Sequence, residues 1–119
     1  MSPEDAIRIQ HILDAAQEAI SFAQGQTYDS LEADSMRSLA IIRLLEIIGE
    51  AASTVSPELK TTHPEIPWRV MAATRNRLIH AYFNVNLRIV LDTVQGDLPP
   101  LLTDLAALVN REPTTGQFG

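Results

Sequence analysis

The stretch that decides the fold reads Leu39-Ala40-Ile41-Ile42-Arg43-Leu44-Leu45-Glu46-Ile47-Ile48-Gly49-Glu50-Ala51-Ala52. Its residue types favour a helix, and at about 100° per residue its apolar side chains cover most of the circumference. Only Arg43, Glu46 and Glu50 gather in one narrow polar stripe. A helix that is apolar almost all round must be covered almost all round, which predicts a central helix of a bundle, a subunit interface, or both.

The polar stripe contains a conflict of charge. Glu46 and Glu50 are like charges four residues apart, and such pairs repel on a helix surface. Arg43 can neutralise one of them, and Arg69 or Arg75 could neutralise the other if the stripe faces a second helix. The sequence equally allows the stripe to face water.

The rest of the chain predicts further helices and no strands. Five helical stretches are expected: from a cap at Ser2 to Gly25, roughly 30–54, from Ser56-Pro57 to before His63, from Pro67 through Ile79, and 87–110. Asn86 is the expected cap of the last stretch, which should kink or split at Gly96 and Pro99-Pro100. The fold class is therefore an all-α bundle of four to five helices. We expect one domain over residues 1–110 and a short, disordered polar tail over 111–119.

Composition narrows the class of protein further. The chain has 119 residues, 45% of them hydrophobic, which is enough for one packed core. Without cysteine it has neither disulfides nor thiol chemistry. The polar, acidic amino terminus does not resemble a signal peptide, and the most apolar run is too short to span a bilayer. We expect a cytoplasmic protein with no membrane partner.

Charge is distributed unevenly along the chain. The net charge is −6, yet the segment from Lys60 to Arg88 carries +4 and the remainder carries −10. Four of the five cations in this segment are arginines, which suit phosphate recognition. An equally good interpretation from charge alone is a solvated helix face. The acidic remainder would repel RNA that binds indiscriminately, and no DNA partner is expected.

One short segment collects chemistry that can act on RNA. From Arg75 to Tyr82 the chain presents a guanidinium, the Asn76 amide, the His80 imidazole and a phenol. An arginine can stabilise phosphate charge, and a histidine can move protons near neutral pH. In such a site a base deprotonates a ribose 2′-OH, the oxygen attacks phosphorus, and an acid protonates the leaving 5′ oxygen. Neither metal nor cofactor is required.

The spacing within this segment restricts how a site could form. Asn76 and His80 share a helix face, whereas Arg75 and His80 are five residues and about 140° apart. Arg75 must reach around, the helix must loosen near His80, or a second copy must complete the site across an interface. Taken alone, an arginine followed by a histidine is common, and a lone histidine is more often structural. A metal enzyme is disfavoured because His11, His63 and His80 lie on separate segments without ligand spacing.

The order of several motifs resembles the HEPN superfamily, and within it the HepT-like toxins. The motifs are Arg43 to Ala51, Ile66-Pro67-Trp68-Arg69, Arg75-Asn76 through His80 to Tyr82-Phe83, and Asp97-Leu98-Pro99. The family signature is Arg, four variable residues, His, one variable residue and Tyr, which here is Arg75, His80 and Tyr82. Asn86 departs from the aspartate that often follows this motif, which puts a helix cap or a partner contact in doubt.

This resemblance implies a fold, a function and a partner. The fold would be an antiparallel bundle that forms a homodimer, with two motifs facing one cleft. The activity would be that of a metal-independent endoribonuclease toxin with Arg75 and His80 as catalytic residues and Asn76 in support. A cognate nucleotidyltransferase antitoxin of the MNT type would silence it by transferring AMP to Tyr82, as in type VII toxin–antitoxin pairs.

Two questions remain open from the sequence. Arg69 and Arg77 are possible RNA contacts, and Glu46 and Glu50 are a possible polar stripe near the site. The alternative function is a non-catalytic HEPN subunit that docks a minimal nucleotidyltransferase. An intact set of Arg75, His80 and Tyr82 favours the ribonuclease.

Overall fold

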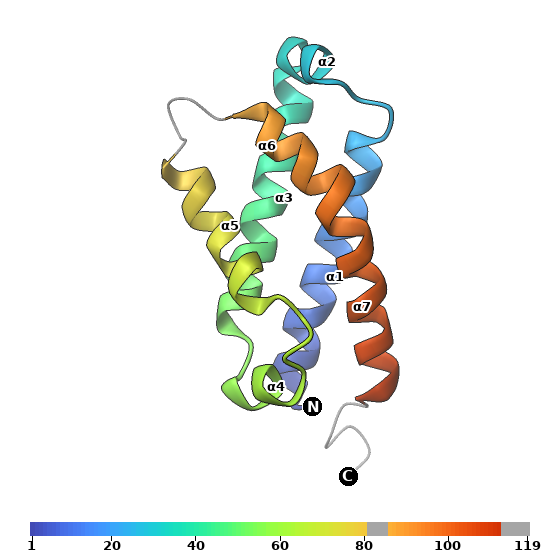
Figure 1. Cartoon of the computed structure of the whole chain (residues 1–119), viewed down its shortest axis with the longest axis vertical. Coiled ribbons are helices and arrows are strands. Elements are labelled where there is room, and N and C mark those ends of the chain that lie inside the picture. Colours follow the sequence, from blue (N-terminus) through green and yellow to red (C-terminus); the bar gives the residue numbers. More distant parts are fainter. Residues whose placement is uncertain (81–85, 113–119) are drawn as a thin grey trace.

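The computed structural model describes residues 1–80 and 86–112, and on its fifth helix it describes side chains as far as Thr74. All regular secondary structure in the described part is helical, as the sequence predicts, and none of it is strand (Figure 1). The elements in chain order are α1 (Pro3–Ala23), α2 (Tyr28–Ala33), α3 (Ser35–Thr54), α4 (Pro57–Thr62), α5 (Trp68–His80), α6 (Leu87–Asp92), the π-helical turn η1 (Thr93–Asp97) and α7 (Leu98–Arg111).

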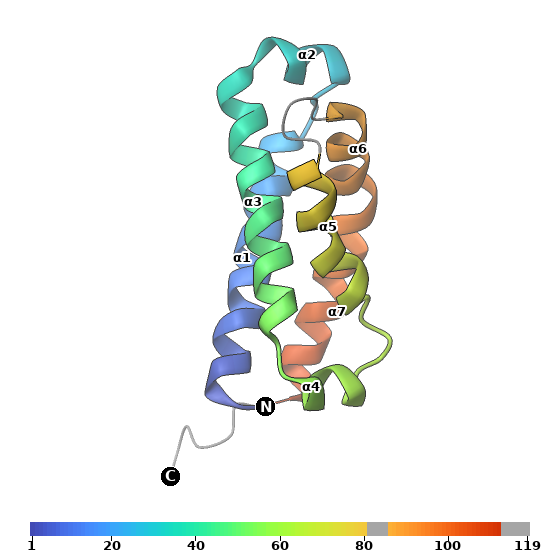
Figure 2. The same cartoon turned by 90° about the vertical axis from the view of Figure 1, so that its left-hand side faces the viewer.

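The long helices form two layers that run up and down the molecule. In Figure 2, α1 and α3 make one layer, while α5 and the continuous run of α6, η1 and α7 make the other. Helix α3 packs against α1 and α5, and α1 packs against α7. The short helix α4 lies at the end of the bundle where the amino terminus and the end of α7 also lie (Figures 1 and 2). Within the described residues, no helix has the length and apolar character needed to cross a membrane.

Helix α3 has the central position that its apolar circumference predicts. Its inner side packs against α1 in its own layer and α5 in the other layer. The buried residues on this side are Ile41, Leu45, Ile48 and Ala52. The opposite side is not covered within one chain, since Met36 is 85% exposed and Leu39 66% exposed. The sequence prediction of nearly complete coverage is therefore met on the inner side only.

The predicted helix over 30–54 is in fact two helices. Its expected start lies within α2, which a capping box between Thr27 and Ser30 begins earlier. Asp34 then interrupts the helical backbone, and its carboxylate accepts a hydrogen bond of 3.1 Å from the Arg37 N–H as the N-cap of α3. A local side-chain bond of this kind competes with continued helix, and the sequence prediction overlooked it.

The last helical region is kinked as predicted. Asn86 caps α6 by accepting from the Arg88 N–H at 3.0 Å and the Ile89 N–H at 3.3 Å. The π-helical turn η1 contains Gly96 and directly precedes Pro99 and Pro100, which stand in the first turn of α7. Proline lacks the N–H that a continuous α-helix needs there, so the backbone changes its hydrogen-bond pattern before it.

Candidate functional site

The loop before α5 holds the start of that helix firmly. The Trp68 indole N–H donates to the His63 carbonyl oxygen at 2.9 Å, and the Ile66 N–H donates to the same oxygen at 3.2 Å. Both Ile66 and Trp68 are buried. Since the loop and the first turn share these bonds and this core contact, the direction in which α5 leaves the loop is determined at its base.

The imidazole of His63 ties this loop to Glu112, just after α7, and through Glu112 to the amino terminus. Its Nδ1 lies 3.2 Å from Glu65 and its Nε2 lies 3.0 Å from Glu112, which also pairs with the terminal amine of Met1 at 3.5 Å. The hydrogen bond from His63 lowers the pKa of Glu112, with help from the amine. A backbone hydrogen bond, followed by His63 and Arg111, lowers the pKa of Glu65. We therefore assign His63 a structural role.

The residues predicted to act on RNA lie on or just after α5. Arg75, Asn76, Arg77 and His80 belong to this helix, but their side chains lie outside the described residues, as does Tyr82 altogether. The backbone of α5 is α-helical through His80. Positions 75 and 80 therefore keep the separation of about 140° that a regular helix imposes.

A basic groove lies at the base of α5, beside the loop that leads into this helix. We call it the α4–α5 groove; its volume is about 640 Å³, and it is lined by Ser53, Lys60, Pro64, Ile66, Pro67, Trp68, Arg69, Val70 and Ala72. Lys60 comes from α4 and the exposed Arg69 from the first turn of α5. The lining includes these two cations and no carboxylate.

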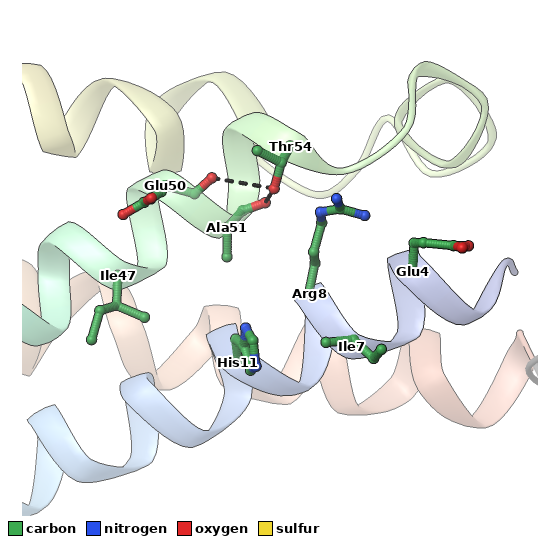
Figure 3. A pocket seen from close by; sticks show the side chains of 8 residues that line it. All are labelled: Glu4, Ile7, Arg8, His11, Ile47, Glu50, Ala51 and Thr54. Atoms are coloured by element: carbon green, nitrogen blue, oxygen red, sulfur yellow. Dashed lines mark hydrogen bonds between the residues drawn. The ribbon is translucent and has the colours of Figure 1, made fainter.

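A second groove of about 450 Å³ lies between α1 and α3, and we call it the α1–α3 groove (Figure 3). It contains Arg8 and His11 together with Glu4 and Glu50. Figure 3 shows the Arg8 guanidinium rising toward the end of α3 near Thr54, with the Glu50 carboxylate turned away from it. The two grooves thus both contain an arginine but differ in the charge around it.

The three residues of the polar stripe on α3 do not share one environment, because Arg43 and Glu46 line neither groove whereas Glu50 lines the α1–α3 groove. Arg43 Nη1 pairs with Glu46 Oε2 at 3.2 Å, which is the neutralisation that the spacing allowed. Glu50 is exposed in the α1–α3 groove and has no ion pair among the described residues, so it does not pair with Arg69. Whether either glutamate approaches Arg75 lies outside the described residues.

The sequence prediction missed two features of these grooves. The sequence places Lys60 in the basic segment without marking it as a site residue, and it does not indicate that Arg8 and His11 share a groove. A signal for the first existed, since the segment from Lys60 to Arg88 contains only one acid. In the part of the chain that the structure describes, no three His, Asp or Glu side chains gather as metal ligands would. The expectation of a metal-free site stays a prediction.

Comparison with known proteins assigns the family. Residues 12–108 match the family model described as "Ribonuclease HepT-like", which covers most of the chain and all of α5. The chain belongs to the HepT-like ribonuclease family. This confirms the resemblance seen in the sequence motifs and indicates a ribonuclease.

Three relatives illustrate the similarity of this HepT-like chain to named proteins. "Probable ribonuclease HepT" of Thermococcus cleftensis is 41% identical over 93 residues, covering 78% of this chain and 84% of the relative. A "Putative RNase" of Caldanaerobacter subterraneus is 33% identical over 87% of this chain and 93% of its own. Another of that name from Methanocaldococcus jannaschii is 33% identical, with 82% and 81% covered. No solved structure matches this chain.

Proposed function

We propose that this HepT-like chain is a metal-independent endoribonuclease with Arg75 and His80 as its catalytic residues. The observation that carries the proposal is the set of Arg75, His80 and Tyr82 on and after α5, in a chain of a ribonuclease family. Asn76 supports the site as a polar neighbour of His80 on the same helix face. The basic segment around α5 supports a phosphate-bearing substrate in an otherwise acidic protein.

The proposed reaction transfers the phosphoryl group within the RNA. A base takes the proton of a ribose 2′-OH, and the oxygen forms a bond to the adjacent phosphorus. Arg75 stabilises the negative charge that grows on the phosphoryl oxygens. The bond to the 5′ oxygen breaks as an acid protonates that oxygen. His80 suits either proton transfer because its ordinary pKa of about 6.5 lies near neutral pH.

A second copy of the chain would complete this site. Positions 75 and 80 do not share a face of α5, so one regular helix does not present both groups to one phosphate directly. In a homodimer with two motifs at one cleft, Arg75 of one chain could act with His80 of either chain, and the two imidazoles could serve as base and acid. The uncovered side of α3, with Met36 and Leu39, offers apolar surface for such a contact.

The proposed biological role is that of a toxin in a toxin–antitoxin pair in the cytoplasm. A minimal nucleotidyltransferase antitoxin would transfer AMP from ATP to the Tyr82 hydroxyl, releasing pyrophosphate. Tyr82 is two residues after His80, so the attached AMP would bring a phosphate and an adenosine close to the catalytic histidine. This group would exclude the substrate phosphate from the site. Arg69 and Arg77 are proposed RNA contacts.

The test is expression of the wild type and of His80→Ala, each with and without the candidate nucleotidyltransferase. We expect wild type alone to arrest growth and His80→Ala to lose at least a hundredfold in cleavage of RNA, since general acid–base catalysis contributes about 10²–10⁴-fold. Co-expression should relieve the arrest and add the mass of AMP to the wild type. Tyr82→Phe is the matched control and should stay toxic and gain no mass.

Two outcomes would overturn parts of the proposal. A folded His80→Ala variant that still arrests growth and cleaves RNA would remove His80 from the catalytic site. A wild type that neither cleaves RNA nor gains AMP, yet forms a stable complex with the nucleotidyltransferase, would establish the non-catalytic binding subunit instead.

A further inference from the structure

Most of the described cations already have a partner. Arg37 pairs with Asp34, the N-cap of its helix, and Arg43 pairs with Glu46 on α3. Arg111 pairs with Glu65, and the Arg88 guanidinium stacks over the Tyr28 ring at 4.3 Å from its centroid. Among the described basic side chains, the remaining ones are Arg8, Lys60 and Arg69, which make no ion pair, hydrogen bond or ring contact. Two of these three line the α4–α5 groove.

The charge around these three cations separates the two grooves. Arg8 shares the α1–α3 groove with Glu4 and Glu50, which would repel an approaching phosphate. Lys60 and Arg69 share a groove whose lining contains no acid. Two acids lie near these cations along the chain. Glu58, two residues before Lys60, does not line this groove but a separate pocket with Met1, Asp5 and Glu112. Glu65 is engaged by His63 and Arg111 at 3.2 and 3.3 Å. The α4–α5 groove is therefore the described cavity in which an anion meets positive charge alone.

The register of α5 connects this groove to the proposed catalytic residues. Positions 69, 76 and 80 recur at intervals of seven and four residues, so an α-helix places positions 76 and 80 on the same face as position 69, each within about 20° of it. This face lies opposite Met71, which is buried. Arg69 and His80 are separated by roughly 16 Å along the axis, at ~1.5 Å per residue. A single strand of RNA that follows this face of α5 would span the distance from Arg69 to His80 with several nucleotides.

We propose that the α4–α5 groove is a phosphate-binding subsite that holds single-stranded RNA several nucleotides from the bond that is cut, with Lys60 and Arg69 as its contacts. This inference rests on the proposed ribonuclease function. It adds a second anchoring point to that function, because RNA too short to reach the groove loses these contacts. The subsite recognises the backbone and carries no base specificity, since both contacts are cations directed to phosphate.

The test measures binding of the full-length protein to a fluorescent single-stranded oligoribonucleotide of about 12 nucleotides, within the usual site sizes of such proteins. The oligonucleotide is 2′-O-methylated, so it cannot be cleaved by attack of its 2′ oxygen. Affinity is measured at several salt concentrations by fluorescence anisotropy. The variant is Lys60→Ala/Arg69→Ala, and the matched control is Arg8→Ala/Arg43→Ala, which changes the net charge equally outside the groove.

We expect the groove variant to flatten the slope of log affinity against log salt by about 1.4, at ~0.7 for each lost contact with a single strand. The control should keep the slope of the wild type. Because Lys60 and Arg69 have no partner among the described residues, circular dichroism and thermal melting should be unchanged in the variant. Arg69→Gln alone should flatten the slope by about half as much and serves if the double variant is unstable.

The outcomes separate this inference from the proposed function. A groove variant with the slope of the control overturns the subsite, even if the wild type cleaves RNA. A wild type that cleaves no RNA overturns the catalytic proposal, while a flattened slope in the groove variant still supports phosphate binding there. A control that flattens the slope as much as the groove variant shows that only net charge matters, and this also overturns the subsite.

Discussion

The two grooves of this small bundle each contain an arginine that has no partner among the described residues, yet their surroundings make them chemically different. In the α1–α3 groove, Arg8 lies among Glu4, His11 and Glu50. In the α4–α5 groove, Arg69 is joined by Lys60 and by no carboxylate. The presence of an arginine therefore does not by itself indicate an anion-binding site. The sign of the other charges that line the groove decides whether an anion is attracted.

The difference also follows from which helices meet in each groove. Helices α1 and α3 belong to the acidic part of the chain, whereas α4 and α5 carry the basic segment that begins at Lys60. The protein thereby keeps a net charge of −6, which disfavours indiscriminate contact with nucleic acid, and still presents one positive surface. This arrangement suits the proposed ribonuclease, which would have to select its RNA.

The largest predicted effect comes from the residue that ties α1, which lines one groove, to the start of α4, which lines the other. Asp5 of α1 is buried and accepts from the Ser56 N–H at 2.9 Å and the Ser56 hydroxyl at 2.5 Å, at the start of α4. We expect Asp5→Ala to leave these donors unsatisfied and to lower the free energy of unfolding by about 2–3 kcal/mol. In thermal melting this corresponds to a drop of roughly 10 °C.

Asp14→Ala is the control for this change. Asp14 lies on the same helix but is exposed and bonded only to Gln10, so its loss should move the melting temperature by about a degree. Equal shifts in the two variants would mean that Asp5 does not join α1 to α4 in the way the bonds indicate.

A smaller effect is expected when the contrast between the grooves is removed. Ser53 is an exposed residue of α3 that lines the α4–α5 groove, so Ser53→Glu places a carboxylate beside its cations. The new carboxylate would repel an RNA phosphate by about 1 kcal/mol, the size of one charge pair in water, so affinity for the methylated oligonucleotide should fall about fivefold. Ser21→Glu, on the exposed side of α1, adds the same charge elsewhere and should leave affinity within twofold. Equal affinities would remove the groove from the RNA path.

The smallest effect is expected from the converse change. Glu4→Gln/Glu50→Gln removes both acids from the α1–α3 groove and leaves Arg8 with His11. Affinity for the same oligonucleotide should rise about twofold, because exposed charges act weakly through water and salt. A rise of more than about tenfold would show that the acids mask a second binding groove and that the α4–α5 groove is not special.

The fold was predictable where local rules act alone. The Ser2 cap, the proline at the start of α4, the Asn86 cap and the kink before Pro99-Pro100 all appear where the sequence places them. The helical periodicity does not reveal the break at Asp34. There the Asp34 carboxylate accepts from the Arg37 N–H, which in a continuous helix would donate to a backbone carbonyl oxygen.

The candidate site was predictable in part. The motif from Arg75 to Tyr82 and the basic segment are visible in the sequence, and the family match confirms the resemblance they carry. The pairing of Lys60 with Arg69 was not visible, since a loop held by the bonds of His63 and Trp68 brings α4 and α5 together. Nor did sequence distance reveal that Glu50 lines the α1–α3 groove that contains Arg8, and not the α4–α5 groove that contains Arg69.

The sequence by itself determined that this chain is a helical bundle with one helix apolar almost all round, a HepT-like signature and a basic segment in an acidic protein. These properties depend on periodicity, capping and residue order, which are local. Only the tertiary structure decided which cations share a groove, which acids they meet and which are already paired. Charges interact through distance in space, and only packing converts positions along the chain into such distances.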